Sequence, residues 1–227
     1  MELGRAISYI FEDKQWVTKL LPLLVIGILS AIPIFGLIAA AVALGFMVQL
    51  AQNVREGLPR PLPKWDDLRV KLEVGGQVLL AMIAYNLPLI LMSMCSYTLI
   101  SGVGGSFLGS ASTLLTICCT LPIAIVYSVI SWSMLAIGVS EYIETGESRR
   151  LYRFGHLWDV LQTQNKVVFQ WAIMATLVNI VFGLIAAIPC IGWLVFILFA
   201  YPVHGHLFGQ FAHRLSVKNK PQKRRAT

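Results

Sequence analysis

Three long stretches of the chain contain no charged residue. Asp, Glu, Lys and Arg are all missing between Lys19 and Arg55, between Glu73 and Glu141, and between Lys166 and Arg214. Charged residues make up 13% of the 227 residues, about half the share usual in soluble domains, while 57% are hydrophobic. A soluble domain of this size is therefore excluded, and we expect the three uncharged stretches to lie in membrane hydrocarbon.

The sequence also lacks the combinations of residues on which catalysis and cofactor binding depend. We find no nucleophile with a base, no metal cluster and no phosphate loop, so we expect neither an enzyme nor a cofactor. The cysteines form no Cys-x-x-Cys pattern and are expected to be buried thiols, with a disulfide or metal role as the alternative. They are Cys95, Cys118, Cys119 and Cys190.

Three histidines, His204, His206 and His213, lie near the end of the third uncharged stretch. His206 and His213 are seven residues apart and can share one helix face, where a pair could ligate a metal or a porphyrin magnesium. No carboxylate or thiolate accompanies them. We therefore favour hydrogen bonds between helices and predict no metal site.

Four charged segments remain, and their basic residues predict the topology. Lys and Arg number 3 in residues 1–19, 5 in 55–73, 4 in 141–166 and 6 in 214–227, which accounts for all 18. If the four segments lie on one side, the positive-inside rule makes that side the cytoplasm. Each uncharged stretch must then leave and return. This gives three hairpins, about six membrane-embedded helices, and cytoplasmic N- and C-termini.

The predicted fold class is all-α, a polytopic transmembrane helical bundle with short interfacial helices in a single membrane domain. Its parts are an interfacial N-terminal helix (1–19), a first hairpin (20–54), a cytoplasmic connector (55–73), a second hairpin (74–140), a cytoplasmic amphipathic connector (141–166), a third hairpin (167–213) and a basic cytoplasmic tail (214–227). The glycine- and serine-rich stretch 101–110 is expected to be the outer loop of the second hairpin.

Two of the uncharged stretches contain the same helix-breaking sequence. Written without gaps, GILSAIPIFG (27–36) faces GLIAAIPCIG (183–192) with five identical positions, which suggests one unit used twice. Proline cannot continue a helix without losing a hydrogen bond, and glycine can take the positive φ of a chain reversal. We therefore predict tight turns at Pro33, Gly36, Pro189 and Gly192.

The first hairpin is short, which leaves other interpretations open. Its legs, 17–32 and 37–54, are at the lower limit for a span, so the pair could thin the bilayer or stop short as a re-entrant pair. One long proline-kinked helix with the N-terminus outside is a second possibility. A signal peptide cleaved after residues 41–43 is a third, although its apolar region would be too long.

Few polar side chains fall within the predicted spans, and Asn86, Ser131 and Asn179 are candidates for polar contacts in the membrane interior. No ionisable residue lies near mid-membrane, which argues against an ion-coupled transporter. We favour a non-catalytic accessory or membrane-organising subunit that packs against a larger complex or forms a homo-oligomer. The alternative is a small permease or channel for a neutral solute.

The basic tail directly follows the last predicted span. Positive charge in that position attracts anionic lipid headgroups, so the bilayer is the expected partner and nucleic acid is not. The residues expected to bind lipid are Arg214, Lys218, Lys220, Lys223, Arg224 and Arg225.

Several short motifs carry a resemblance to a known family. They are FEDKQW (11–16) with Phe11, Asp13 and Trp16, the two Ile-Pro-x-x-Gly breaks, and GLPRPLPKWDDL (57–68), in which Leu62, Pro63, Trp65, Asp66 and Asp67 precede Gly75 or Gly76. In these features the chain resembles a family of prokaryotic integral membrane proteins classified as a domain of unknown function. The resemblance implies a six-helix-like protein of a bacterial or archaeal cell membrane, and no reaction, ligand or catalytic residue.

Overall fold

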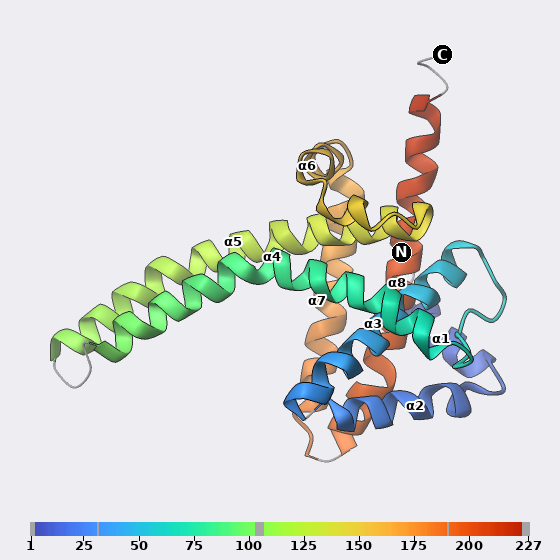
Figure 1. Ribbon diagram of the computed structural model, residues 1–227, viewed down its shortest axis with the longest axis horizontal. Coiled ribbons are helices and arrows are strands. Elements are labelled where there is room, and N and C mark those ends of the chain that lie inside the picture. The colour runs from blue at the N-terminus through green and yellow to red at the C-terminus, as the bar shows by residue number, and fades with distance from the viewer. Residues whose placement is uncertain (1–2, 31, 103–106, 190, 224–227) are drawn as a thin grey trace.

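The structure, a computed structural model, describes residues 3–30, 32–102, 107–189 and 191–223, and Figure 1 shows how their helices are arranged. Every element in these residues is a helix, which confirms the predicted all-α fold. In chain order they are α1 (Leu3–Glu12), α2 (Trp16–Leu29), α3 (Pro33–Arg55), α4 (Leu68–Gly102), α5 (Phe107–Thr145), the 3-10 helix η1 (Ser148–Tyr152), α6 (Phe154–Thr163), α7 (Asn165–Ala186) and α8 (Ile191–Lys223).

Within the described residues, five helices are long and apolar enough to cross a membrane, as in a multi-pass membrane protein. The candidate spans are Phe35–Arg55, Leu68–Thr98, Ile117–Thr145, Asn165–Ala186 and Ile191–Ser216. The sixth expected helix, α2, has 14 residues. At about 1.5 Å per residue it is too short for roughly 30 Å of hydrocarbon. The estimate of about six embedded helices thus resolves into five of full length and one short helix.

The helices form the three expected pairs, α2 with α3, α4 with α5, and α7 with α8. The alternative of one long kinked helix over residues 17–54 is wrong, because α2 and α3 are separate helices. α4 and α5 run side by side as a long hairpin that projects from the rest of the molecule, crosswise to α7 and α8 (Figure 1). α3 and α8, the second helices of the two repeat-related pairs, also pack together.

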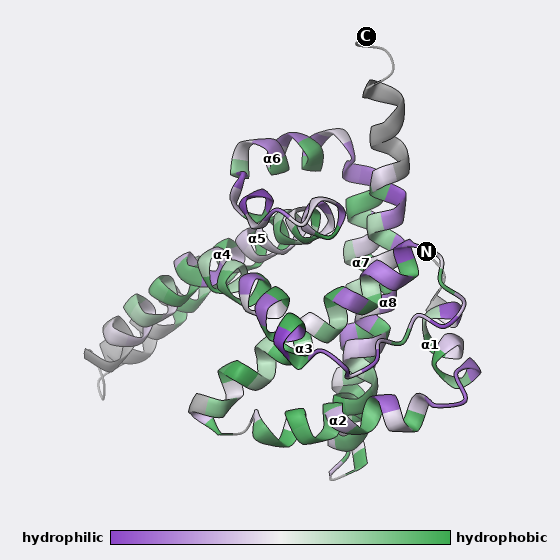
Figure 2. Ribbon diagram, turned by 45° about the vertical axis from the view of Figure 1, so that its right-hand side comes forward, coloured by the Kyte–Doolittle hydropathy of each residue, from purple (hydrophilic) through white to green (hydrophobic). Residues whose placement is uncertain are grey.

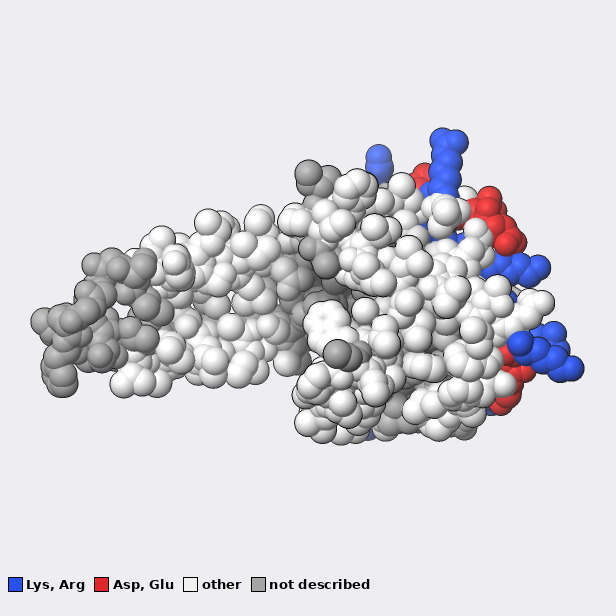
Figure 3. Space-filling view, turned by 90° about the horizontal axis from the view of Figure 1, so that it is seen from below, with Lys and Arg blue, Asp and Glu red and all other residues white. Residues whose placement is uncertain are grey.

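Hydrophobic and charged residues are separated along the molecule. Hydrophilic residues are frequent in α6 and in the segment before α4, whereas hydrophobic residues predominate along α2 and much of the described part of the α4–α5 hairpin (Figure 2). On the face seen in Figure 3, the charged side chains gather at the end of the molecule remote from the projecting hairpin. Such a division is typical of a protein with one end in water and the other in lipid.

The N-terminal helix expected over residues 1–19 is interrupted, so this boundary is wrong. α1 ends at Glu12 and α2 begins at Trp16. Between them, the Asp13 carboxylate accepts a hydrogen bond from the Gln15 N–H at 3.0 Å, and the Asp13 carbonyl accepts one from the Trp16 N–H at 3.0 Å. A short polar side chain that bonds the backbone two residues on favours a turn over a continuous helix.

The second hairpin is longer than the uncharged stretch that predicts it. α4 begins at Leu68 rather than residue 74, and α5 continues to Thr145 rather than residue 140. Charged side chains are compatible with helix ends that reach water, so an uncharged stretch marks the hydrocarbon and not the helix limits. Gly146, with a φ of 71°, then ends α5 in a conformation that suits glycine.

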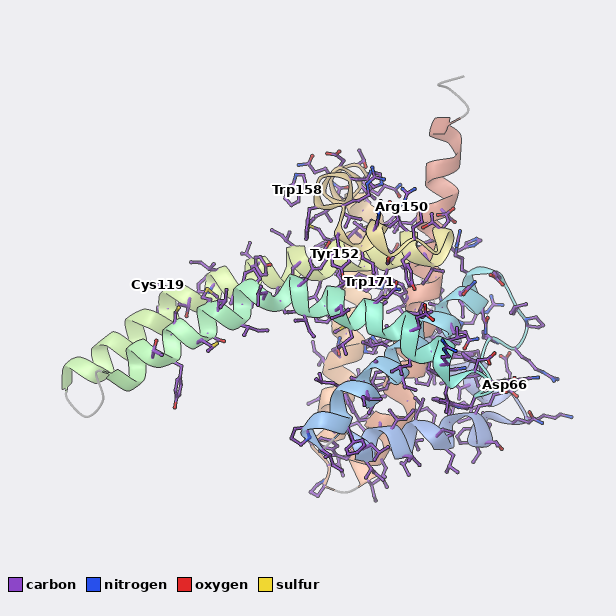
Figure 4. The ribbon with its side chains drawn as sticks, in the orientation of Figure 1. Asp66, Cys119, Arg150, Tyr152, Trp158 and Trp171 are labelled. Atoms are coloured by element: carbon purple, nitrogen blue, oxygen red, sulfur yellow. The ribbon has the colours of Figure 1, made fainter. Side chains whose placement is uncertain are left out.

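The amphipathic connector forms η1 and α6 and folds against the hairpin. α6 buries Leu157 and Val160 and leaves Trp158 42% exposed, as an amphipathic helix does (Figure 4). The Tyr85 hydroxyl of α4 donates to the Leu151 carbonyl oxygen of η1 at 3.0 Å, in a buried position. This bond ties the connector to the base of the hairpin.

Candidate functional site

The connector between α3 and α4 starts at a sharp helix end. Gly57 has a φ of 75°, its N–H donates to the Val54 carbonyl oxygen at 3.1 Å, and the Leu58 N–H donates to the Asn53 carbonyl oxygen at 3.1 Å. This is the pattern of a Schellman motif, in which a left-handed residue reverses the chain after a helix. The Asn53 side chain also donates to the Pro61 carbonyl oxygen at 2.8 Å, so the connector folds back over α3.

An ion pair links the N-terminal turn to this connector. The Lys19 Nζ lies 2.7 Å from Asp13 Oδ2 and 3.2 Å from the Leu62 carbonyl oxygen, with the two side chains 13% and 6% exposed. Burial alone would raise the pKa of the Asp13 carboxyl. The hydrogen bonds from Lys19 and Gln15 and the positive charge of Lys19 outweigh burial and hold that pKa below its usual value of 3.8.

Trp65 anchors the end of the connector. Its indole Nε1–H donates to the Lys19 carbonyl oxygen at 2.7 Å, and its rings stack on Phe46 of α3 with centroids 5.0 Å apart. An indole with an apolar body and a bonded N–H is typical of the membrane interface. The tryptophan therefore joins α2, α3 and the connector at a single point.

Lys71, in the first turn of α4, lies beneath the connector and is only 3% exposed. Its Nζ donates to the Lys64 carbonyl oxygen at 2.6 Å and lies 5.7 Å from the centre of the Trp65 ring. Among the described residues, Lys71 forms no ion pair within 4.0 Å. A buried ammonium with three donors is thus bonded by one backbone oxygen.

These groups surround a polar cavity of about 360 Å³, which we call the connector pocket. Its charged lining consists of Lys19, Arg60, Lys64, Lys71, Asp66 and Asp67. Gln49 of α3 also lines it, and the Gln49 Oε1 is buried without a hydrogen-bond partner in the part of the chain that the structure describes. Figure 4 places Asp66 at the end of the molecule remote from the hairpin tip. The pocket therefore contains more positive than negative groups, together with the unpaired Gln49 Oε1 acceptor.

A second cavity, of about 470 Å³, lies between α4 and α5 and is mainly apolar. Four of the polar side chains on its walls, Asn86, Ser93, Ser96 and Ser128, donate to carbonyl oxygens of their own helices. The Asn86 side chain donates to the Met82 carbonyl oxygen at 2.7 Å, and the Ser128 hydroxyl donates to the Ala124 carbonyl oxygen at 2.7 Å. Their hydrogen-bonding capacity is partly used inside the helix that carries them.

The three polar residues predicted in the membrane interior do not share this cavity. Asn86 lines it, whereas Ser131 is buried in α5 outside it and Asn179 is exposed on α7. The Asn179 side chain donates to the Ala175 carbonyl oxygen of its own helix at 3.0 Å. The structure therefore distributes these residues over three helices instead of gathering them in one site.

The predicted helix-break turns are present in both copies of the repeat. Pro33 is the first residue of α3, where the missing N–H costs nothing, and Pro189 lies in the turn before α8. In the first copy the Gly36 N–H donates to the Ile32 carbonyl oxygen at 2.6 Å. In the second copy the Gly192 N–H donates to the Ile188 carbonyl oxygen at 3.1 Å. The two copies of the repeat therefore share this backbone hydrogen bond as well as their sequence.

The reason for the glycines in these turns differs from the predicted one. Among the described glycines only Gly57 and Gly146 have positive φ, so the expectation for Gly36 and Gly192 is wrong. A Cβ on Gly36 would instead lie 2.8 Å from the Ser30 carbonyl oxygen, and one on Gly192 would collide with the Ile185 carbonyl oxygen. Both glycines let a new helix start against the end of the previous one.

The expectation of buried cysteines is wrong for those that the structure describes. Cys95, Cys118 and Cys119 are free and exposed on the α4–α5 hairpin, where Figure 4 labels Cys119. An uncharged helix that projects from the body has no protein neighbours on most faces, so its apolar thiols meet lipid instead of a core. Cys190 lies outside the described residues.

The histidines contact different helices. The His206 ring stacks on Tyr9 of α1 with centroids 4.3 Å apart, and the Tyr9 hydroxyl donates to the Pro202 carbonyl oxygen at 2.9 Å. His213 Nδ1 lies 3.3 Å from the Arg55 carbonyl oxygen of α3. These are contacts between helices, and they hold α1 and the end of α3 against α8.

The basic tail continues α8 as far as Lys223. Arg214, the first residue expected to bind lipid, donates from Nη1 to the Gln170 Oε1 of α7 at 2.9 Å in an exposed position, and its binding of lipid stays a prediction. Lys218, Lys220 and Lys223 belong to this helix, and Arg224 and Arg225 lie outside the described residues.

Comparison with known proteins gives a single kind of match. The family model described as Protein of unknown function (DUF4013) matches residues 26–191, which is most of the chain. The chain belongs to the DUF4013 family. This confirms the resemblance to a family of unknown function. No curated protein and no solved structure matches the chain.

The DUF4013 match includes the connector, the whole α4–α5 hairpin and α7, but not α1. The motif at Phe11, Asp13 and Trp16 therefore lies outside the matched segment, while the Leu62–Asp67 motif lies within it. Of the two glycines left open by the resemblance, Gly75 is packed tightly and Gly76 faces open space.

The sequence singled out Asp66 and Asp67 but missed the pocket that they help to line. Lys19, Gln49 and Lys71 come from three different helices, and no sequence spacing connects them. The available signal was positional, since Lys19 is the last charge before the first uncharged stretch and Lys71 lies just before the second.

Proposed function

We propose that this DUF4013 protein is a non-catalytic membrane subunit whose α4–α5 hairpin packs against helices of a partner in the bilayer. The observation that carries the proposal is the projection from the body of this hairpin, whose sequence carries no charge over residues 74–140. Its large apolar side chains are exposed on both helices, with Leu80 of α4 62% and Val126 of α5 60% exposed. A helix pair that is apolar all round needs lipid or other helices around it.

The polar groups of the hairpin support packing over transport. Asn86, Ser93 and Ser128 each donate to a carbonyl oxygen of their own helix, at 2.7, 2.8 and 2.7 Å. A permeation path for a neutral solute requires polar groups that face the solute and form hydrogen bonds with it one after another as it moves. The α4–α5 cavity, with Asn86 on its wall, is the place where a permease would have its path.

Photo-cross-linking in native membranes tests the proposed packing. A benzophenone side chain replaces Val126 on the hairpin or, as the matched control, Val181 on α7, which is 54% exposed. We expect a discrete protein adduct from position 126, either with a second copy or with another subunit, and none from position 181. Identical patterns from both positions, or lipid adducts alone, contradict the proposal.

The permease alternative has its own measurement. Purified protein in liposomes is tested for osmotic swelling in glycerol or urea, with empty liposomes as the reference. We expect equal rates. A faster rate that Asn86→Leu abolishes would favour a permease.

We further propose that the charged end faces the cytoplasm of a prokaryotic cell, with both termini on that side. The basic excess of the four charged segments supports this orientation. Single cysteines at Phe35 and Arg149, in a background without the four native cysteines, test it. Arg149 is expected to label from the inside only, and labelling from the outside would contradict the orientation.

A further inference from the structure

The connector pocket has the chemistry of a ligand site that the packing function does not use. Four basic side chains and two acidic ones line about 360 Å³, leaving an excess of two positive charges, and one remains after Asp13 neutralises Lys19. An anion is therefore favoured over a cation. The volume is within the usual range for small-molecule sites.

Lys71 is the strongest binding group in the pocket. It is only 3% exposed. Among the described residues, however, its Nζ donates a hydrogen bond only to the Lys64 carbonyl oxygen. A buried ammonium is costly unless it is paired and fully hydrogen-bonded. The carboxylates of Asp66 and Asp67 act on the Lys71 charge without forming an ion pair with it among the described residues. A phosphate oxygen would supply the direct ionic contact and the further acceptors that Lys71 lacks.

Gln49 adds a second requirement. Its Oε1 is buried with no partner among the described residues, so a hydrogen-bond donor from a ligand would satisfy it. The carboxylates of Asp66 and Asp67 on the same wall also accept hydrogen bonds. A ligand that carries an anionic oxygen together with an N–H or O–H group satisfies both sides of the pocket.

The position of the pocket indicates where such a ligand comes from. The pocket lies at the charged ends of α2, α3 and α4, beside Trp65, whose bonded indole is typical of the membrane interface. Phospholipid headgroups occupy that level of the bilayer. We propose that the connector pocket binds the phosphate group of a phospholipid whose headgroup also carries a hydrogen-bond donor, as phosphatidylethanolamine and phosphatidylglycerol do.

Native mass spectrometry of the full chain in detergent, titrated with phosphatidylethanolamine, tests the site. We expect one lipid to bind specifically and Lys71→Met to weaken its binding at least about tenfold, because a charge-assisted bond is lost. Arg69→Gln is the matched control. It removes the same charge two residues away, on an exposed side chain outside the pocket, and should leave binding within about twofold of the native protein.

A second variant keeps the test decisive if Lys71→Met fails to fold. Arg60 lines the pocket and is itself exposed, so Arg60→Gln leaves the helix packing intact. It should weaken binding several-fold more than Arg69→Gln. Equal binding by the native protein and the folded pocket variants, or equal loss from Arg60→Gln and Arg69→Gln, overturns the proposal.

Two separate experiments test the contact with the headgroup donor and the source of the phosphate. Phosphatidylcholine lacks an N–H donor and should bind about fivefold more weakly than phosphatidylethanolamine, a difference that Gln49→Leu should remove. Equal binding of the two lipids to the native protein overturns the proposed donor contact. Inorganic phosphate added to the phosphatidylethanolamine titration distinguishes the source. Failure to compete assigns the site to lipid, whereas competition that depends on Lys71 overturns the lipid assignment in favour of free phosphate.

Discussion

Gly75 of α4 lies directly against Ala41 of α3, so that a Cβ on the glycine would collide with the Ala41 carbonyl oxygen. The obstacle is backbone, which cannot turn aside as a flexible side chain can. A reciprocal contact occurs nearby, where a Cβ on Gly45 of α3 would collide with the Lys71 carbonyl oxygen of α4. The crossing of these two helices therefore depends on two glycines, one from each helix.

We expect Gly75→Ala to lower the free energy of unfolding by about 1–3 kcal/mol, because α3 and α4 must separate to admit the methyl group. Gly76→Ala is the matched control. No atom lies within 4 Å of a Cβ at Gly76, so this change should be neutral or stabilise the helix by up to about 1 kcal/mol. Unfolding in mixed micelles with increasing sodium dodecyl sulfate measures both. Equal effects of the two substitutions would contradict the close crossing.

The second prediction concerns the repeated turn. Gly192→Ala forces a methyl group onto the Ile185 carbonyl oxygen, and we expect a loss of about 1–3 kcal/mol. Gly183→Ala, at the start of the same repeat, meets nothing within 4 Å and should not destabilise the protein. Thermal unfolding followed by circular dichroism in detergent compares them. The idea fails if Gly183→Ala proves the more harmful change.

Much of the fold follows from where charge is missing. The three uncharged stretches correspond to the three helix pairs, and the Ile-Pro-x-x-Gly repeat locates the breaks within the first and third. These features depend on local chemistry, since proline removes one donor wherever it lies and hydrocarbon excludes charge everywhere. Helix ends such as Leu68 and Thr145 follow local turns in water, where charge gives no boundary.

The features that could not be predicted depend on packing between distant segments. Gly36 and Gly192 have the turn role predicted for them, but their cause is a carbonyl oxygen of the preceding helix, which only the folded turn places there. Lys19 and Lys71 likewise meet around the connector pocket because α2 and α4 both pack near α3. No period or motif in the sequence encodes that meeting.

The third prediction is a pH dependence from the Asp13–Lys19 ion pair. The folded-state pKa of Asp13 lies below its usual value of 3.8. The ion pair therefore contributes its full stability above that value, and the contribution is lost as the pH falls through the lower folded-state pKa. Asp13→Asn should cost about 1–3 kcal/mol at pH 7, and the difference from the native protein should shrink below about pH 4.

Glu12→Gln serves as the control for Asp13→Asn, because the neighbouring Glu12 is exposed. It should change the unfolding midpoint little at any pH. The measurement is the unfolding midpoint of both variants and the native protein between pH 3 and pH 7, chosen as a range about the usual carboxyl value. A stability difference for Asp13→Asn that grows on acidification would have the wrong sign.

The last prediction separates the two contacts of Trp65. Trp65→Phe keeps an aromatic ring near Phe46 but removes the hydrogen bond to the Lys19 carbonyl oxygen, so we expect a loss of about 1 kcal/mol. Trp65→Ala removes both contacts and should cost about 3 kcal/mol. Trp193→Ala is the control, since that indole is 60% exposed. Denaturation in mixed micelles ranks the three variants. Because the Trp65 ring lies 5.7 Å from the Nζ of Lys71, which lines the connector pocket, Trp65→Ala should also release bound phosphatidylethanolamine while Trp193→Ala retains it. Retention by both variants would mean that the indole holds the helices together without shaping the pocket.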